Sequence, residues 1–101
     1  MSYRLKIKPD AENDLEESAN WYNTQRSNLG VEFLDEVEEA VERIARNPFL
    51  FQQRYRKVRV AFCRRFPVGI YFTIEKEEVV VHAVLHTSRN PMIWKRRAKS
   101  G

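Results

Sequence analysis

The chain opens with a strict alternation of apolar and basic residues. Tyr3, Leu5 and Ile7 fall on one face of an extended segment. Arg4 and Lys6 fall on the other face. A two-residue period is that of a β-strand with one buried face. The pattern therefore predicts a short first strand whose outer face is basic.

The period then lengthens to that of two amphipathic helices. Pro9 suits the first position of a helix, where its missing N–H costs nothing, and an apolar stripe continues to about Gln25. A second stripe begins near Phe33. It should end just before Pro48, because proline disfavours helical geometry in the preceding residue. Residues 27–30 form a short link, so the two helices are predicted to make an antiparallel hairpin.

The rest of the chain returns to extended patterns. We expect three further strands at about residues 55–64, 68–75 and 79–86, with a charged turn at 75–78 between the last two. The last strand is apolar on both faces, which is typical of a central strand covered from both sides. The tail, residues 94–101, is predicted to be either a short helix or a frayed end.

The predicted order of elements is β–α–α–β–β–β. Strands on one side and a helical hairpin on the other form a two-layer α+β fold, with the hairpin packed on an antiparallel sheet. A chain of 101 residues can build one modest core. Residues 1–101 are therefore predicted to be a single domain.

Charge is distributed unevenly along the chain, although the net charge is only +4. Residues 10–46 hold eleven acidic and three basic side chains, whereas residues 47–101 hold twelve basic and three acidic ones. The helical part is thus acidic and most of the strand part is basic. This asymmetry favours a polyanion or an acidic peptide as a partner of the sheet side, and the alternative is a dipolar, solvated surface.

Composition excludes several classes of protein. The chain is 43% hydrophobic, without an apolar run of membrane-spanning length or an apolar signal segment near its start. We therefore expect a cytoplasmic protein with no membrane partner. The single cysteine, Cys63, excludes an internal disulfide and a cysteine metal cluster. His82 and His86 lie four residues apart, but on a strand rather than a helix. We expect neither a metal nor a cofactor.

The clearest concentration of reactive groups follows the last predicted strand. His86, Ser88, Arg89 and Asn90 lie within five residues of one another. A strand that ends in these residues presents hydrogen-bonding and cationic groups at the edge of a sheet. Such an edge is suited to a phosphate or a carboxylate.

This segment also resembles the C-terminal half of the RelE/ParE superfamily, the toxins of type II toxin–antitoxin pairs. In that family an FPY-I-Y-like strand leads to a strand ending in V-x-H-x-x-R, and the matching residues here are Phe66, Pro67, Ile70, Tyr71, Val84, His86 and Arg89. The N-terminal half is similar at Ala11, Asp14, Leu15, Trp21, Tyr22, Gly30, Phe33, Leu34, Ile44, Asn47 and Pro48. The resemblance covers nearly the whole chain and implies the RelE/ParE fold, which has the same order of elements.

One branch of the superfamily, resembling RelE, cleaves mRNA within the ribosome by attack of a 2′-hydroxyl on the adjacent phosphate. That chemistry needs a base, an acid and cations that stabilise the developing charge. On this alternative His86 would be the acid or base. Arg65 and Arg89 would clamp phosphate oxygens, and Arg59 is a further candidate. The other interpretation of Arg59 and Arg65 is a solvated strand face or a pair with antitoxin carboxylates.

The other branch, resembling ParE, has the same fold without the full nuclease set and is linked to inhibition of DNA gyrase. This sequence fits that branch better. The lysine cluster of RelE-like nucleases is reduced here to Lys57, and no tyrosine lies near His86 and Arg89 after the last strand. The favoured interpretation is a ParE-like toxin that inhibits gyrase and replication without being an enzyme. A RelE-like mRNA endonuclease and a non-toxic, basic nucleic-acid-binding module are the alternatives.

Either branch implies a cognate antitoxin as partner, with an amphipathic and often acidic C-terminal segment that wraps around the toxin. Arg59 and Arg65 are predicted to pair with its acidic side chains. Phe49, Phe51 and Trp94 are predicted to be exposed anchors for its apolar ones. The alternative for these three rings is packing within the fold.

Overall fold

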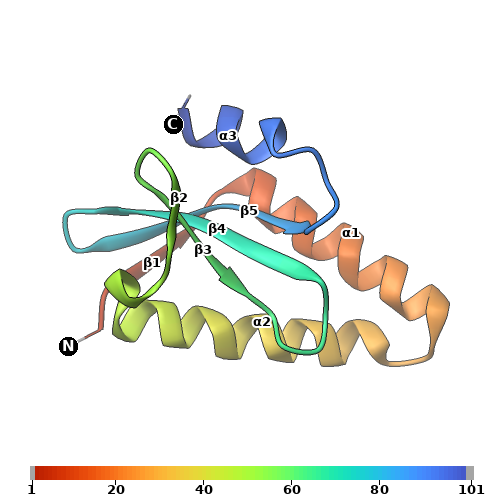
Figure 1. Ribbon diagram of the computed structural model, residues 1–101. Helices are drawn as coiled ribbons and strands as arrows, with labels where there is room; N and C mark the ends of the chain where they lie inside the picture. The colour runs from red at the N-terminus through yellow and green to blue at the C-terminus, as the bar shows by residue number, and fades with distance from the viewer. Residues whose placement is uncertain (1, 100–101) are drawn as a thin grey trace.

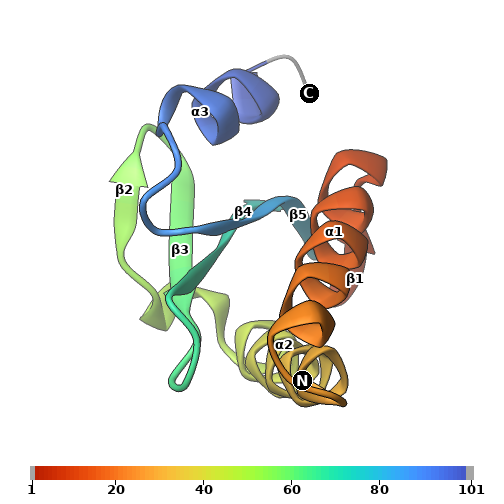
Figure 2. The same cartoon turned by 90° about the vertical axis from the view of Figure 1, so that its right-hand side faces the viewer.

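The computed structural model describes residues 2–99, and its central element is a five-stranded sheet with the order β1-β5-β4-β3-β2. Helices lie on both faces of this sheet (Figures 1 and 2). The strands are β1 (Arg4–Ile7), β2 (Gln53–Tyr55), β3 (Val58–Phe62), β4 (Val68–Glu75) and β5 (Glu78–His86). The helices are α1 (Pro9–Gln25), α2 (Leu29–Arg46), the short 3-10 helix η1 (Pro48–Leu50) and α3 (Met92–Lys99). The predicted α+β fold is confirmed.

The helical hairpin forms as predicted, with a difference at its turn. α2 begins at Leu29, so Gly30 lies inside the helix rather than in the link. Close packing of the two helices explains this glycine. A Cβ atom on Gly30 would lie 2.3 Å from the carbonyl oxygen of Ala19 on α1. The Gly30 N–H also donates to Oδ1 of Asn23 at 2.7 Å, which fixes the crossing.

The helical hairpin covers one face of the sheet and makes the main core. Phe33 and Ile44 of α2 are fully buried against Ile70 and Phe72 of β4. Phe66, in the loop before β4, packs edge-on against Tyr22 and Phe33, with ring centroids 4.8 and 5.4 Å away. Ile70 and Phe72 of β4 therefore face the helical hairpin, whereas Tyr71 between them faces the opposite side of the sheet.

The strand prediction for residues 55–64 is wrong in one respect, because two strands occupy this region. β2 and β3 form an antiparallel hairpin whose turn is Arg56 and Lys57. Arg56 adopts φ 51°, the left-handed region that glycine or asparagine usually occupies in such turns. The sequence has neither residue here, so the usual signal of a hairpin is missing.

The sheet is mixed rather than fully antiparallel. β2 to β5 pair antiparallel, but β1 pairs parallel with β5, with Leu5 opposite Val79 and Ile7 opposite Val81. Parallel pairing needs a long crossover, which the intervening helices and strands supply. β5 therefore lies between two strands, and all its residues from Val79 to Leu85 are buried. Its predicted central position is confirmed.

The third helix resolves the alternatives for the C-terminal tail in favour of a short helix. α3 lies across the face of the sheet opposite the α1–α2 hairpin (Figure 2). Trp94 stacks on Tyr71 of β4 with ring centroids 4.6 Å apart and planes 13° apart. Together with Val58, Val60 and Leu85 they make a second, smaller core.

A β-bulge in β5 creates the attachment point of α3. Tyr71 pairs with Ala83 and Phe72 with Val81, which leaves His82 as the extra residue. Side chains satisfy the backbone groups near the bulge. Asp14 of α1 accepts the Val84 N–H at 3.0 Å, and Arg97 of α3 donates to the His82 carbonyl at 3.3 Å.

Asp14 and Arg97 also bind each other directly. Arg97 donates two hydrogen bonds to the Asp14 carboxylate, at 2.5 and 3.2 Å, and the Asp14 side chain is only 8% exposed. This forked ion pair connects α1, β5 and α3 in one contact. The sequence did not reveal it, because the two residues lie 83 positions apart.

Candidate functional site

The sheet has two ends with different chemistry. The first, which we call the loop end, contains the β3–β4 loop (63–67) and the C-terminal end of β5. The second, which we call the turn end, contains the β2–β3 turn (56–57) and the β4–β5 turn (76–77). Three of the sequence-predicted residues lie at the loop end: Arg65, His86 and Arg89.

Arg65 is held toward the acidic face of α2. Its guanidinium donates to Oε1 of Glu32 at 2.7 Å, and Oε1 of Glu36 accepts the backbone N–H groups of Arg64 and Arg65. The Arg65 hydrogen bond lowers the pKa of the Glu32 carboxyl below its usual value. The Arg65 side chain remains 60% exposed. It is thus an accessible cation whose charge is partly satisfied within the chain.

His86 starts a tight turn after β5. Its Nδ1 accepts the Ser88 backbone N–H at 3.1 Å and lies 2.7 Å from the Ser88 hydroxyl. An Nδ1 that accepts an N–H leaves the proton of the neutral ring on Nε2. The carbonyl of His86 accepts the Arg89 N–H at 2.9 Å, and Asn90 Oδ1 accepts the Met92 N–H at the start of α3. This polar cluster therefore connects β5 to α3.

The loop end brings these residues to one region without assembling them into one centre. His86 pairs with Val68, just after the Arg65 loop, and the Thr87 N–H donates to the Pro67 carbonyl at 2.8 Å. Within residues 2–99, however, no hydrogen bond or ion pair joins the side chains of Arg65, His86 and Arg89. Each of these side chains is exposed.

Arg59 lies elsewhere and stabilises a loop. Its guanidinium donates to the Phe51 carbonyl at 2.7 Å and lies over the Phe49 ring, 5.2 Å from the centroid. It therefore holds the segment after α2 against the sheet. Because Arg59 makes these contacts, it is better described as a residue that stabilises the loop than as part of a solvated strand face. Its role in partner binding stays a prediction.

The three predicted aromatic anchors differ in exposure. Phe49 is 58% exposed, as expected of an anchor. Phe51 is half-buried and packs edge-on against Phe72, with centroids 5.9 Å apart. Trp94 is only 7% exposed because it lies between α3 and Tyr71, so the expectation that it is exposed is wrong. Its indole instead attaches α3 to the sheet.

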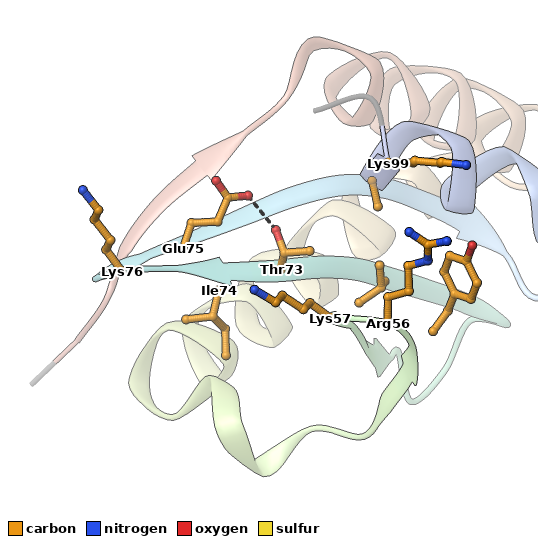
Figure 3. Close-up of a pocket in the computed structure, with 10 residues that line it drawn as sticks. Arg56, Lys57, Thr73, Ile74, Glu75, Lys76 and Lys99 are labelled. Carbon is orange, nitrogen blue, oxygen red and sulfur yellow. Dashed lines mark hydrogen bonds between the residues drawn. The ribbon is translucent and has the colours of Figure 1, made fainter.

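The turn end carries a groove that sequence reasoning did not single out. It has a volume of about 560 Å³ and lies between the last turn of α3 and the β2–β3 turn. Figure 3 shows Lys99 entering from α3 on one side and Arg56 and Lys57 from the turn on the other, with Thr73 and Glu75 of β4 between them. The split of the predicted long strand into a hairpin places Arg56 and Lys57 there.

Behind the groove wall lies the buried histidine of the bulge. The Thr73 hydroxyl donates to Glu75 at 2.9 Å, and the same oxygen lies 2.9 Å from Nε2 of His82. The single hydroxyl proton is used toward Glu75, so Nε2 of His82 carries the proton it shares with Thr73. His82 Nδ1 is buried without a hydrogen-bond partner. Burial lowers the pKa of the His82 ring, and nearby Lys8 lowers it further.

We expect the fold to lose stability as pH falls below about 6.5, the ordinary histidine pKa. The folded pKa of His82 is depressed, so below that pH the unfolded chain binds the additional proton. The slope of the free energy of unfolding against pH should approach about 1.4 kcal/mol per pH unit for one proton. Urea unfolding between pH 7 and pH 5 measures it. His82→Gln should flatten the slope, and an unchanged slope in this variant would contradict the assignment.

The described residues contain neither a cluster of metal ligands nor a membrane-spanning helix. In residues 2–99, no group of three or more His, Cys, Asp or Glu side chains is placed to hold a metal ion. No helix in the same part of the chain is both long enough and apolar enough to cross a membrane.

Cys63 is buried, and burial raises the pKa of its thiol to about 11, so it is a poor nucleophile.

The fold is shared with chains from known toxin–antitoxin systems. A chain of the chromosomal ParDE TA system from P. aeruginosa is similar over 84% of this chain and 96% of its own length, with 17% identity and a TM-score of 0.74. A chain of the toxin–antitoxin complex RelBE2 from Mycobacterium tuberculosis is similar over 85% of this chain and 99% of its own, with 18% identity and a TM-score of 0.57. A search of curated proteins found no match.

The family follows from the sequence match. A family model described as the ParE toxin of the type II toxin–antitoxin system, parDE, matches residues 5–91. The chain therefore belongs to the ParE toxin family. The resemblance to the RelE/ParE superfamily, and the preference for its ParE branch, are confirmed.

Proposed function

We propose that this ParE-family toxin arrests growth by binding DNA gyrase and blocking replication, and that a cognate antitoxin neutralises it. The match to the ParE family over residues 5–91 carries this proposal. The similar chain from P. aeruginosa also comes from a ParDE system, which supports an antitoxin partner here. Inhibition by binding needs an accessible surface rather than an assembled catalytic centre.

The geometry of the loop end supports binding over RNA cleavage. Cleavage needs an acid and a base positioned about one phosphate, together with cations. His86 is the one exposed histidine of the described chain, and Arg65 is turned toward Glu32. Arginine is a poor proton carrier because its pKa exceeds about 12. Tyr71 of β4 is stacked beneath Trp94, where burial raises its phenol pKa.

Charge supports an acidic antitoxin segment as the neutralising contact. The helical hairpin is acidic, and the segment from residue 47 onward is basic. A partner with an acidic segment would thus be attracted to the sheet side and repelled by the hairpin side. Binding only to the folded toxin would also raise its apparent stability, by roughly 2.7 kcal/mol at a hundredfold excess of partner over Kd.

Expression of the chain alone in bacteria tests the proposal in cells. We expect growth arrest with filamentation and a DNA-damage response, and rescue by the co-expressed antitoxin. Rapid loss of translation with cut mRNA would instead indicate the RelE-like alternative. Normal growth at full protein level would leave the non-toxic nucleic-acid-binding interpretation.

We expect the arrest to depend on the polar groups at the end of β5. His86→Ala and Arg89→Ala should relieve it more than His82→Gln, because the first two side chains are exposed and His82 is 2% exposed. Viable counts should be compared at equal levels of soluble protein, since His82 contributes to the fold. Relief by the His82 variant alone would overturn this order.

A further inference from the structure

The groove at the turn end is an unbalanced positive site. Arg56, Lys57, Lys76 and Lys99 line it, against one carboxylate, Glu75. Within residues 2–99 none of these four cations forms an ion pair; the ion pairs there involve Arg26, Arg65 and Arg97. Glu75 is itself engaged by the Thr73 hydroxyl. The groove therefore presents several cations whose charge no ion pair within the described residues neutralises.

The floor of the groove is apolar, so it suits more than a simple anion. Tyr55, Val58 and Ala98 contribute to it. A volume of about 560 Å³ is within the range of sites that enclose a ligand of moderate size. A site with an apolar floor and a cationic rim selects a ligand that carries both apolar groups and negative charge.

The groove continues beyond α3 toward an exposed aromatic ring. A second hollow, lined by Phe49, Gln53 and Arg59, shares Lys57, Ile74 and Lys76 with the first. Phe49 is 58% exposed, and the Arg59 guanidinium lies against its ring. The two hollows together make an extended surface around the turn end, which fits a length of chain rather than a single small molecule.

Three observations favour an acidic peptide over a nucleic acid. The Tyr55 ring is already covered by the Lys95 ammonium at 4.7 Å and the Arg56 guanidinium at 5.4 Å, and Trp94 packs edge-on against it, so it offers no open face on which a base could stack. The Glu75 carboxylate in the wall can accept hydrogen bonds from peptide N–H groups, whereas a phosphodiester backbone offers it no donor. A long polyanion would also meet the acidic helical hairpin.

We infer that this groove is the docking site of an acidic, amphipathic peptide segment. Its carboxylates pair with Arg56, Lys57 and Lys99, and its apolar side chains occupy the floor beside Tyr55 and Ala98 and extend around the turn end toward Phe49. The inference rests on the proposed function, because the segment it commits to is that of the neutralising antitoxin. It adds the place where the segment binds and the residues that bind it.

The test compares two triple variants of the full chain with the same loss of charge. The groove variant is Arg56→Gln, Lys57→Gln and Lys99→Gln. The control variant is Arg4→Gln, Lys6→Gln and Arg46→Gln, which are exposed residues of β1 and α2. The probe is a short synthetic peptide of glutamate and leucine in amphipathic order, and its affinity is measured by fluorescence anisotropy at physiological salt.

The groove variant should bind this peptide about tenfold more weakly than the unmodified chain, because each exposed ion pair contributes roughly 0.2–1 kcal/mol. The control variant should bind it nearly as well as the unmodified chain. Equal losses in the two variants, or no binding by the unmodified chain, would overturn the inference. So would a single-stranded oligodeoxythymidylate that binds the groove more tightly than the peptide does.

The outcome is separable from that of the proposed function. Growth arrest and its rescue by the antitoxin are measured without this peptide. A toxin that is rescued equally well in both triple variants keeps the proposed function and loses the groove as the docking site. A chain that never arrests growth fails the proposed function, whatever the peptide does.

Discussion

Asp14→Ala should lower the free energy of unfolding by about 3–4 kcal/mol. Removing one partner of a buried ion pair typically costs about 3–5 kcal/mol, because the other charge stays buried without compensation. Arg97 is 21% exposed and also lies 3.8 Å from Asp10, so part of the loss is recovered. The variant further leaves the Val84 N–H at the bulge without its acceptor.

Urea unfolding at neutral pH measures this loss, and two variants separate its causes. Asp10→Ala removes an acid that is 69% exposed and should cost less than about 1 kcal/mol. Asp14→Asn keeps an oxygen for the Val84 N–H and should fall between the two. An Asp14→Ala variant as stable as Asp10→Ala would show that the forked contact does not hold α3 and β5 together.

Trp94→Ala should cost about 3–4 kcal/mol and release α3 from the sheet. Replacing a buried Phe or Trp with alanine typically costs about 3–5 kcal/mol. Here the indole stacks on Tyr71 and packs edge-on against Tyr55, and it closes the second core. Thermal unfolding followed by near-ultraviolet circular dichroism reports both the stability and the loss of the stacked rings.

Met92→Ala is the matched control, because Met92 begins the same helix and is 46% exposed. It should leave stability within about 0.5 kcal/mol of the unmodified chain. A Trp94 variant that unfolds like the control but binds the antitoxin poorly would restore the view that Trp94 is an anchor for the partner rather than part of the core.

Local patterns were enough to predict most of the fold. The α1–α2 hairpin followed from its two apolar stripes, and the central position of β5 followed from its apolar character on both faces. The position of β4 followed from the extended pattern of residues 68–75, which are the residues of the observed strand. These features depend on residues close together in the chain, where the period of burial is visible.

The errors have two other origins, which are contacts between distant segments and a turn that lacks its usual residue types. The parallel pairing of β1 with β5 joins strands about seventy residues apart. The β2–β3 turn relies on Arg56 in a left-handed conformation that its residue type does not signal. Asp14 could have been suspected as an acid three residues after buried Ala11 on the apolar side of α1, but its partner on α3 could not.

The site was predicted only in part for the same reason. Sequence order located Arg65, His86 and Arg89 at the end of strands, and the structure places them at one end of the sheet. The sequence alone could not show that the Arg65 side chain turns toward Glu32 or that Trp94 is buried. The groove was missed because its cations come from the β2–β3 turn, β4–β5 turn and α3, which only the folded chain brings together.

One paired assay in vitro tests the central claim, that this toxin acts by binding gyrase and not by cutting RNA. The purified chain is added to a gyrase supercoiling reaction and, separately, to a translating system whose mRNA is read by primer extension. The account predicts loss of supercoiling, restored by the antitoxin, with intact mRNA. Undiminished supercoiling together with strong, site-specific mRNA cleavage that disappears in His86→Ala would contradict it.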